Sequence, residues 1–214
     1  MEQKTLNGTI VGYDPGGNGS QGVAKLSISA SQCTAIEVCT LDTAEDVISW
    51  IDEVDDLIGV GVDTLACWST GSSGWRAADL WLRKRYKDIY QSVVSPNGLY
   101  GSMGLNGMAV LVSIREKRPD LPISETHPKV LYWALQRKKY DYTNGAREMD
   151  LDLSDWLGIN VRTANDHEWD AAVSALAALR GMQSQWTHDL FRLPTDQTAR
   201  LVLPCGQVQY WWPE

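Results

Sequence analysis

The fold of this chain is indicated first by residues 9–17, TIVGYDPGG, where a short apolar strand ends in a carboxylate and a glycine-rich turn. Residues 58–63, IGVGVD, repeat the pattern of a buried strand that ends in an acid. Much later in the chain, residues 165–170, NDHEWD, open a strongly apolar helix. Because an open α/β sheet binds ligands outside the carboxyl ends of its strands, Asp14 and Asp63 are expected to lie near a common site.

Hydrophobic periodicity predicts the order βββαβ for the N-terminal part of the chain. Strands are expected at 8–13, 22–29 and 33–40, separated by turns, and residues 24–29 alternate apolar and polar side chains as a half-buried antiparallel strand does. A helix with a threonine N-cap follows from about 44 to 54. The next strand, 58–62, is almost wholly apolar, which is typical of a central strand covered on both faces.

The rest of the chain is expected to be mainly helical. Helices are expected at about 75–86, 146–157 and 166–181, with another that ends at Lys117. A short strand at 122–125 and a terminal hairpin over about 199–212 complete the expected elements. With 214 residues, no repeats and no linker-like stretch, the sequence predicts one α/β domain, 1–214, with a mixed sheet of about five strands and helices on both faces.

The charge balance argues against one class of nucleic-acid binder. The formal net charge is −8, whereas proteins that hold long duplexes by general basicity rely on Lys and Arg. The four cysteines lack CxxC spacing and a nearby His, so neither a disulfide framework nor a zinc site is expected. The N-terminus lacks a signal-peptide pattern and no apolar run approaches a membrane span, so we expect a cytoplasmic location.

Tryptophan usage is unusual, with ten Trp and a single Phe. We expect most of these indoles to fill the core in place of Phe, because large aromatic side chains are normally buried. Three of them lie next to the acidic segments and are set apart as candidates for stacking on a nucleobase: Trp68, Trp75 and Trp169.

The late helix carries several polar side chains on one face. Asp166 and Asp170 are four positions apart and His167 and Asp170 are three apart, so all lie on or near the same side. Hard cations such as Mg²⁺ or Mn²⁺ prefer carboxylate oxygens, and two such ions about 4 Å apart can activate a water and neutralise a leaving oxygen. Carboxylates packed together without a cation repel one another, which favours a metal site if the fold brings them together.

Each of these residues also has a structural explanation. Asp14 suits a turn, Asp63 and Asp166 suit caps, His167 suits an exposed helix position, and Glu125 is either a cap or a ligand. Asp170 is the hardest to explain structurally, because it lies one turn inside a helix whose later residues are uniformly apolar. The common placement of these residues at element ends favours a metal site over the separate explanations.

The element order and its three acidic segments resemble the ribonuclease H-like fold. The late helix, HEWDAAVSAL at 167–176, resembles the final catalytic helix of RuvC-type Holliday-junction resolvases. More closely, the chain is similar to the DUF429 family of predicted nucleases through these segments: VGYDP at 11–15, VGVD at 60–63, RAADLWLR at 76–83, PN at 96–97 with Met103, ETHP at 125–128, and NDH at 165–167 with Asp170 and Ala171.

The resemblance implies a role for each candidate residue. Asp14, Asp63 and Asp170 are the core metal ligands, His167 or Asp166 is the fourth, and Glu125 lies at the rim. The catalytic set is then Asp14, Asp63, His167 and Asp170. The resemblance also places Arg76 and Arg83 beside the site, where they could hold a phosphate. The alternative for these arginines is an ordinary salt-bridge ladder along their helix, with Asp79 between them.

These expectations converge on a divalent-metal-dependent nuclease or phosphodiesterase that uses Mg²⁺ or Mn²⁺. The acidic composition suits a short or single-stranded nucleic acid better than a long duplex. No membrane partner is expected, and residues 210–212, YWW, could contact a second copy of the chain. The rival interpretation is a ribonuclease H-like module without catalysis, which serves as an interaction or nucleotide-sensing surface. Carboxylates within reach of one ion favour the enzyme, and a carboxylate turned into a salt bridge favours the module.

Overall fold

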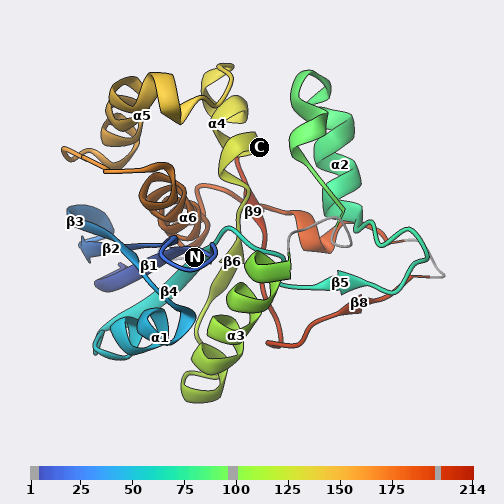
Figure 1. The fold of residues 1–214 in the computed structure, drawn as a ribbon, viewed down its shortest axis with the longest axis horizontal. Coiled ribbons are helices and arrows are strands. Elements are labelled where there is room, and N and C mark those ends of the chain that lie inside the picture. The colour runs from blue at the N-terminus through green and yellow to red at the C-terminus, as the bar shows by residue number, and fades with distance from the viewer. Residues whose placement is uncertain (1–4, 96–100, 196–198) are drawn as a thin grey trace.

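A five-stranded mixed sheet lies at the centre of the structure, a computed structural model that describes residues 5–95, 101–195 and 199–214 (Figure 1). Its strands are β1 (Gly8–Asp14), β2 (Gln21–Ser29), β3 (Gln32–Leu41), β4 (Leu57–Val62) and β6 (Ile123–Glu125), in the order β3-β2-β1-β4-β6. β2 pairs antiparallel with β1 and β3, whereas β4 runs parallel to β1 and to β6. This arrangement confirms the expected ribonuclease H-like α/β class, with antiparallel strands followed by parallel ones.

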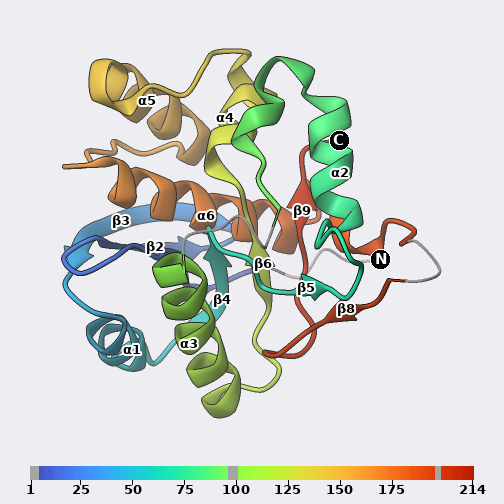
Figure 2. The same cartoon turned by 45° about the vertical axis from the view of Figure 1, so that its right-hand side comes forward.

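Helices cover both faces of the sheet (Figure 2). α1 (Ala44–Asp52) and α3 (Gly101–Lys117) lie on one face, where they enclose an apolar core that includes Val60 of β4. α6 (Asp166–Met182) lies across the opposite face and packs against β1, β2 and β4, with α5 (Tyr142–Leu157) against its outer side. The helix that carries three of the candidate site residues is therefore in direct contact with the sheet.

The remaining elements are short: β5 (Trp68–Ser69), α2 (Ala77–Arg85), the 3-10 segment Lys87–Ser92, α4 (Pro128–Gln136), β7 (His188–Asp189), the 3-10 turn Leu190–Arg192, β8 (Leu201–Val202) and β9 (Trp211–Trp212). α4 begins three positions after the last residue of β6, so its first turn lies beside the carboxyl ends of the parallel strands. None of the helices in the described residues is both long and apolar enough to cross a lipid bilayer.

Three glycines let α6 lie close to the sheet. A Cβ atom on Gly12 would come 1.8 Å from the Ala171 carbonyl oxygen, and one on Gly61 would come 1.8 Å from the Ser174 carbonyl oxygen. Gly22 of β2 likewise meets the backbone at the start of the helix. No side chain fits at such distances, so the backbones of helix and strands pack directly against each other.

The expected terminal hairpin over 199–212 is wrong. β8 pairs antiparallel with β5 and β9 pairs antiparallel with β7, so the two halves of the segment have different partners. Figure 1 shows β5 and β8 side by side, away from the sheet. The reason is burial: Tyr210 and Trp212 lie in the core, and Trp212 Nε1 donates to the Tyr86 hydroxyl at 2.8 Å, whereas Val202 is exposed. Local alternation predicted two strands here but not that one of them belongs to the core.

Trp169, expected as a candidate for base stacking, is a core residue. It is fully buried, its Nε1 donates to the Met149 carbonyl oxygen at 3.1 Å, and the Tyr140 ring packs edge-on against it. Trp68 and Trp75 are partly exposed, and stacking by these two residues stays a prediction. The general expectation that indoles replace Phe in the core applies to Trp169 itself.

Candidate metal centre

The carboxyl ends of β1 and β4 bring Asp14 and Asp63 next to each other. The two strands pair in parallel with Tyr13 opposite Val62, and the Asp63 amide donates to the Tyr13 carbonyl oxygen at 2.9 Å. Side chains alternate along a strand, so each acid faces the same side of the sheet as the glycine two residues before it. That side is the one covered by α6.

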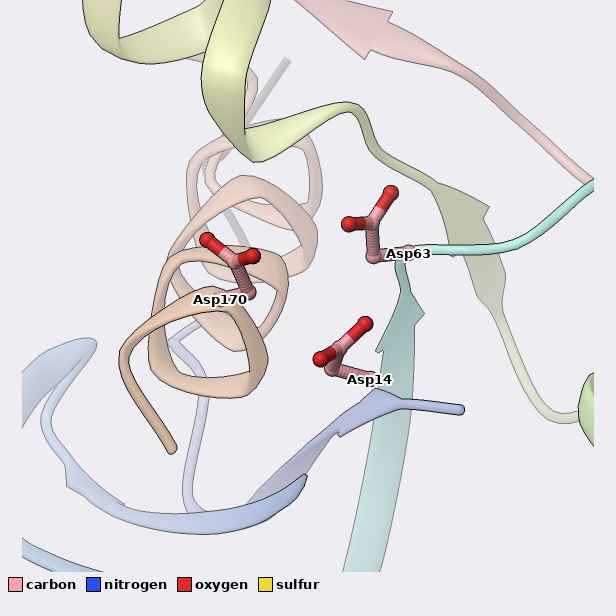
Figure 3. A group of neighbouring side chains, drawn as sticks. All are labelled: Asp14, Asp63 and Asp170. Carbon is pink, nitrogen blue, oxygen red and sulfur yellow. The ribbon is translucent and has the colours of Figure 1, made fainter. Parts of the chain in front are cut away.

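α6 supplies the third carboxylate. One carboxylate oxygen each from Asp14, Asp63 and Asp170 lie within 4.8 Å of one another. Figure 3 shows Asp170 extending from α6 beside the ends of the two strands. The structure thus brings together the three residues that were expected as core ligands, from two strands and a helix.

The three carboxyl groups lie in surroundings that oppose their ionisation. Asp14 and Asp170 are 3% and 5% exposed, and Asp63 is half-buried. Burial, and after it the charges of the neighbouring acids, raises the pKa values of Asp14 and Asp170 well above their ordinary range. Burial also raises the pKa of Asp63 to about 7. A cation between the three groups would offset both the desolvation and the mutual repulsion.

One oxygen of the cluster lacks a regular hydrogen bond. Asp170 Oδ1 is buried and forms no hydrogen bond within the described part of the chain. Buried polar atoms are normally paired, and the Tyr140 hydroxyl interacts with this carboxylate, which counteracts the effect of burial on its pKa. A cation among the three acids would give Oδ1 a further partner. Three carboxylates are a suitable set of ligands for Mg²⁺ or Mn²⁺, which bind to a few carboxylate oxygens and keep several water ligands. The residues present therefore fit a divalent cation.

His167 lies directly beside the cluster. Its Nδ1 is 2.6 Å from Asp14 Oδ2, and its side chain is 35% exposed. The contact fixes the orientation of the imidazole ring and leaves Nε2 as the nitrogen that can exchange a proton or bind a ligand. The expected proximity of His167 to the acids is thus present, whereas its role in a reaction is a proposal.

Asp166 is exposed at the first position of α6 and is not the helix cap. Asn165 is the N-cap, and its side-chain oxygen accepts from the Glu168 amide at 3.0 Å. Asp166 lies outside the group of three acids but, after burial and Asp63, its charge contributes to the raised pKa of Asp14. Its exposed carboxylate can therefore act only from the outer side of the cluster.

The expectation that Glu125 is a metal ligand at the rim is wrong. Glu125 is 2% exposed, and its two oxygens accept from Arg76 Nη2 and Nη1 at 2.6 and 2.7 Å. Oε2 also accepts from the Ala66 amide at 2.8 Å. The Arg76 guanidinium already neutralises this carboxylate, which holds the Ala66 amide and so anchors the loop that follows β4.

The two arginines expected to hold a phosphate form ion pairs and hydrogen bonds within the protein instead. Arg76 is buried, and its Nε and Nη2 donate to Asp79 at 2.9 and 2.7 Å in addition to the pairing with Glu125. Arg83 Nη1 donates to backbone carbonyl oxygens of the segment that follows α2 at 2.9 and 2.6 Å. The phosphate role is therefore wrong for Arg76, which instead forms the expected alternative, an ion pair with Asp79. Arg83 donates its hydrogen bonds to the backbone.

Two residues near the cluster were not expected from the sequence. Lys129 is exposed in the first turn of α4, and its charge counteracts the effect of burial on the pKa values of Asp14, Asp63 and Asp170. Tyr140 has a buried hydroxyl that faces the Asp170 carboxylate without meeting normal hydrogen-bond geometry, and after burial the charge of Asp170 contributes to the raised pKa of Tyr140. The only sequence signal for Lys129 was its place in the first turn after a strand end, and Tyr140 had none.

Comparison with known proteins gives similarity at the level of solved structures. No protein-family model and no curated protein matches the chain. The chain is similar to a structure of Thermus thermophilus RuvC, with 17% identity and a TM-score of 0.44 over 82% of this chain and 96% of that chain. It is also similar to T. thermophilus RuvC in complex with Holliday junction substrate, with 16% identity, a TM-score of 0.46, and 83% and 95% coverage. Membership of the DUF429 family stays a prediction, and its expected 96–97 segment lies outside the described residues.

Proposed function

We propose that the protein hydrolyses a nucleic-acid phosphodiester with the help of Mg²⁺ or Mn²⁺ held by Asp14, Asp63 and Asp170. The observation that supports this proposal is the approach of three carboxylates, from β1, β4 and α6, to within 4.8 Å. Asp170 Oδ1 lies among them without a hydrogen bond. A purely structural role does not account for this arrangement, because burying unpaired acids side by side costs free energy.

The surrounding residues suit the handling of a phosphate and a proton. A bound divalent ion supplies positive charge for the phosphate oxygens and lowers the pKa of a water next to it. Asp14 orients the His167 ring through Nδ1, so that Nε2 can take or give a proton at a substrate oxygen. Lys129 is exposed and close to the acids, so its ammonium group can attract the phosphate.

The rival interpretation, a module without catalysis, predicted that one of the acids would turn into a salt bridge. Among the described residues, Asp14 pairs with His167, and neither Asp63 nor Asp170 forms an ion pair with Lys or Arg. The geometry thus favours the enzyme. The net charge of −8 favours a short or single-stranded substrate, because a long duplex is held mainly by Lys and Arg.

The test is a calorimetric titration of the protein with Mn²⁺. Asp14→Asn should lower the affinity by more than about tenfold, a loss of at least about 1.4 kcal/mol of binding free energy. The matched control is Asp55→Asn, which changes an exposed acid at the opposite end of β4 and should leave the affinity unchanged. Equal affinity in Asp14→Asn and wild type would refute the metal site. Tight Mn²⁺ binding without cleavage of a single-stranded oligonucleotide would favour the non-catalytic module.

A further inference from the structure

A second binding feature lies next to the carboxylate cluster. A pocket of about 160 Å³ opens beside Asp63, between the end of β6, the first turn of α4 and the segment that follows α2. Pockets for drug-sized ligands measure about 300–1,000 Å³, so this one has room for a single ring system and not for a base pair. Its lining includes Thr126, His127 and Lys129, which lie just before and within the first turn of α4.

Two of these lining residues have buried polar atoms without a partner in the described part of the chain, Thr126 Oγ1 and His127 Nδ1. His127 Nε2 lies 3.0 Å from the Ser92 carbonyl oxygen, and a carbonyl can only accept, so Nε2 carries the hydrogen. Nδ1 is then an acceptor with an unused lone pair. Burial also lowers the pKa of His127 to about 4, which keeps the ring neutral at neutral pH.

The rest of the lining is apolar on one side and charged on the other. Leu65, Val93 and Tyr210 are buried at the pocket wall and offer flat or branched apolar surfaces for a ring. Lys129 is exposed and Asp63 is half-buried, so the charged side of the pocket is continuous with the carboxylate cluster. The lining also includes Arg76, Asp79 and Glu125, which are paired with one another and so leave His127 Nδ1, the Thr126 hydroxyl and Lys129 as the groups open to a ligand. An apolar wall beside an acceptor, a hydroxyl and a cation is complementary to a nucleotide.

We propose that this pocket binds one unstacked nucleobase of the substrate, next to the phosphodiester at the carboxylate cluster. His127 Nδ1 accepts a hydrogen bond from a base N–H, the Thr126 hydroxyl bonds to a ring nitrogen or carbonyl oxygen, and Lys129 contacts the phosphate. The inference rests on the proposed function and narrows its substrate to a strand whose bases are accessible, since only an unpaired base can leave the stack at low cost. It also agrees with the preference for single strands that the acidic composition suggests.

The test is equilibrium binding of nucleoside 5′-monophosphates and of methyl phosphate, which carries the phosphate without a base, at a fixed Mn²⁺ concentration. Wild-type protein should bind at least one of the four nucleotides about tenfold or more tightly than methyl phosphate. His127→Phe keeps an aromatic ring but lacks the acceptor, and should reduce this ratio to near one. The control is His188→Phe, because His188 lies outside the pocket.

Thr126→Val is a second variant of nearly the same size, which tests the pocket if His127→Phe does not fold. It should lower the ratio by about threefold or more, which corresponds to the loss of one hydrogen bond. Equal affinity of wild-type protein for all nucleotides and for methyl phosphate would overturn the pocket. A short thymidine oligonucleotide distinguishes the two sources of the base: tighter binding than the monophosphate indicates a strand, and equal binding indicates a free nucleotide.

The two proposals fail in different ways in these experiments. If the pocket is wrong but the metal site is right, Mn²⁺ binds, Asp14→Asn weakens its binding, and nucleotides have no advantage over methyl phosphate. If the metal site is wrong but the pocket is right, nucleotides keep their advantage without Mn²⁺ and His127→Phe still removes it. Mn²⁺ affinity in His127→Phe should equal that of the wild type, because His127 is not one of the three acids.

Discussion

Gly12 of β1 and Gly61 of β4 lie opposite each other in the parallel register, and each precedes an acid of the cluster by two residues. Both glycines contact the backbone of α6, so the distance between that helix and the sheet depends on the absence of two side chains. Because Asp170 is carried by the same helix, the spacing of the three carboxylates depends on this contact as well.

Gly61→Ala should therefore damage both the fold and the site. The new methyl group would lie 1.8 Å from the Ser174 carbonyl oxygen, and overpacking of this kind costs about 1–3 kcal/mol of unfolding free energy. Mn²⁺ affinity should fall by more than about tenfold, because α6 has to move away from the strands. Urea unfolding and Mn²⁺ titration measure the two effects.

The matched control is Gly145→Ala in α5, where an added Cβ meets nothing within 4 Å. Alanine is favoured over glycine within a helix by up to about 1 kcal/mol, so this variant should be as stable as the wild type or more stable. If the Gly61→Ala variant binds Mn²⁺ as tightly as the wild type does, then the close packing of α6 on the sheet does not determine the geometry of the site.

Asp170→Asn should stabilise the metal-free protein. Burial and the neighbouring acids hold the pKa of Asp170 well above its ordinary range, so the native state carries an electrostatic penalty that the amide removes. The variant should therefore gain stability at neutral pH in the absence of metal. Calorimetric melting with and without Mn²⁺ should show this gain together with loss of the Mn²⁺-induced rise in Tm. A destabilised variant that still responds to Mn²⁺ would mean that Asp170 is a structural residue.

The stability of the metal-free protein should fall as the pH rises toward 7. Burial raises the pKa of Asp63 from 3.8 to about 7, so in this window the folded state keeps a proton that the unfolded chain has released. A group with a raised folded-state pKa stabilises the fold fully below the unfolded pKa and loses that contribution as the pH passes through the folded value. Urea unfolding at about pH 5 and about pH 8 should therefore show a larger loss for wild type than for Asp63→Asn. Equal losses in the two proteins would show that Asp63 ionises in the fold without penalty.

Arg76→Met should be strongly destabilising, in contrast to a change at a phosphate-binding surface. It leaves the carboxylates of Glu125 and Asp79 buried without their cation, and breaking a buried ion pair in this way costs roughly 3–5 kcal/mol. Arg83→Met is the control on the same helix; it removes hydrogen bonds to backbone carbonyls and cation–π contacts with Trp75 and Tyr90, but leaves no buried carboxylate unpaired, and should cost less. The measurement is urea unfolding of both variants. Wild-type stability in Arg76→Met would mean that the buried ion pairs contribute nothing.

The core of the site was predictable because each of its acids interrupts an apolar pattern. Asp14 and Asp63 end strands that became parallel neighbours, and Asp170 lies inside a helix that is otherwise apolar on that side. The glycine two residues before each strand acid was an additional signal in the sequence, since it marks the strand face that a helix backbone approaches.

Glu125 shows where such patterns fail. Like Asp63 it lies at the carboxyl end of a parallel strand, and it is paired in register with Val62, the residue before Asp63. The difference is Arg76, which comes 49 positions earlier and reaches the Glu125 carboxylate from the start of α2. A long-range ion pair leaves no periodic signal in the sequence. The sequence therefore does not distinguish a strand-end acid that is paired with a buried cation from a strand-end acid that is free to bind a metal. The terminal strands were mispredicted for the same reason, because their partners are also distant.

The contact between His167 and Asp14 joins positions 153 residues apart, so the cluster closes only after α6 has docked on β1. Contacts at such separation form late, because the entropy of closing a long loop opposes them. On the ribosome β1 and β4 can pair while α6 has yet to be synthesised, and the two strand acids then lack their third partner. A chain that still lacks α6 therefore has no assembled metal site, and the proposed hydrolysis becomes possible only once this helix has docked on the sheet.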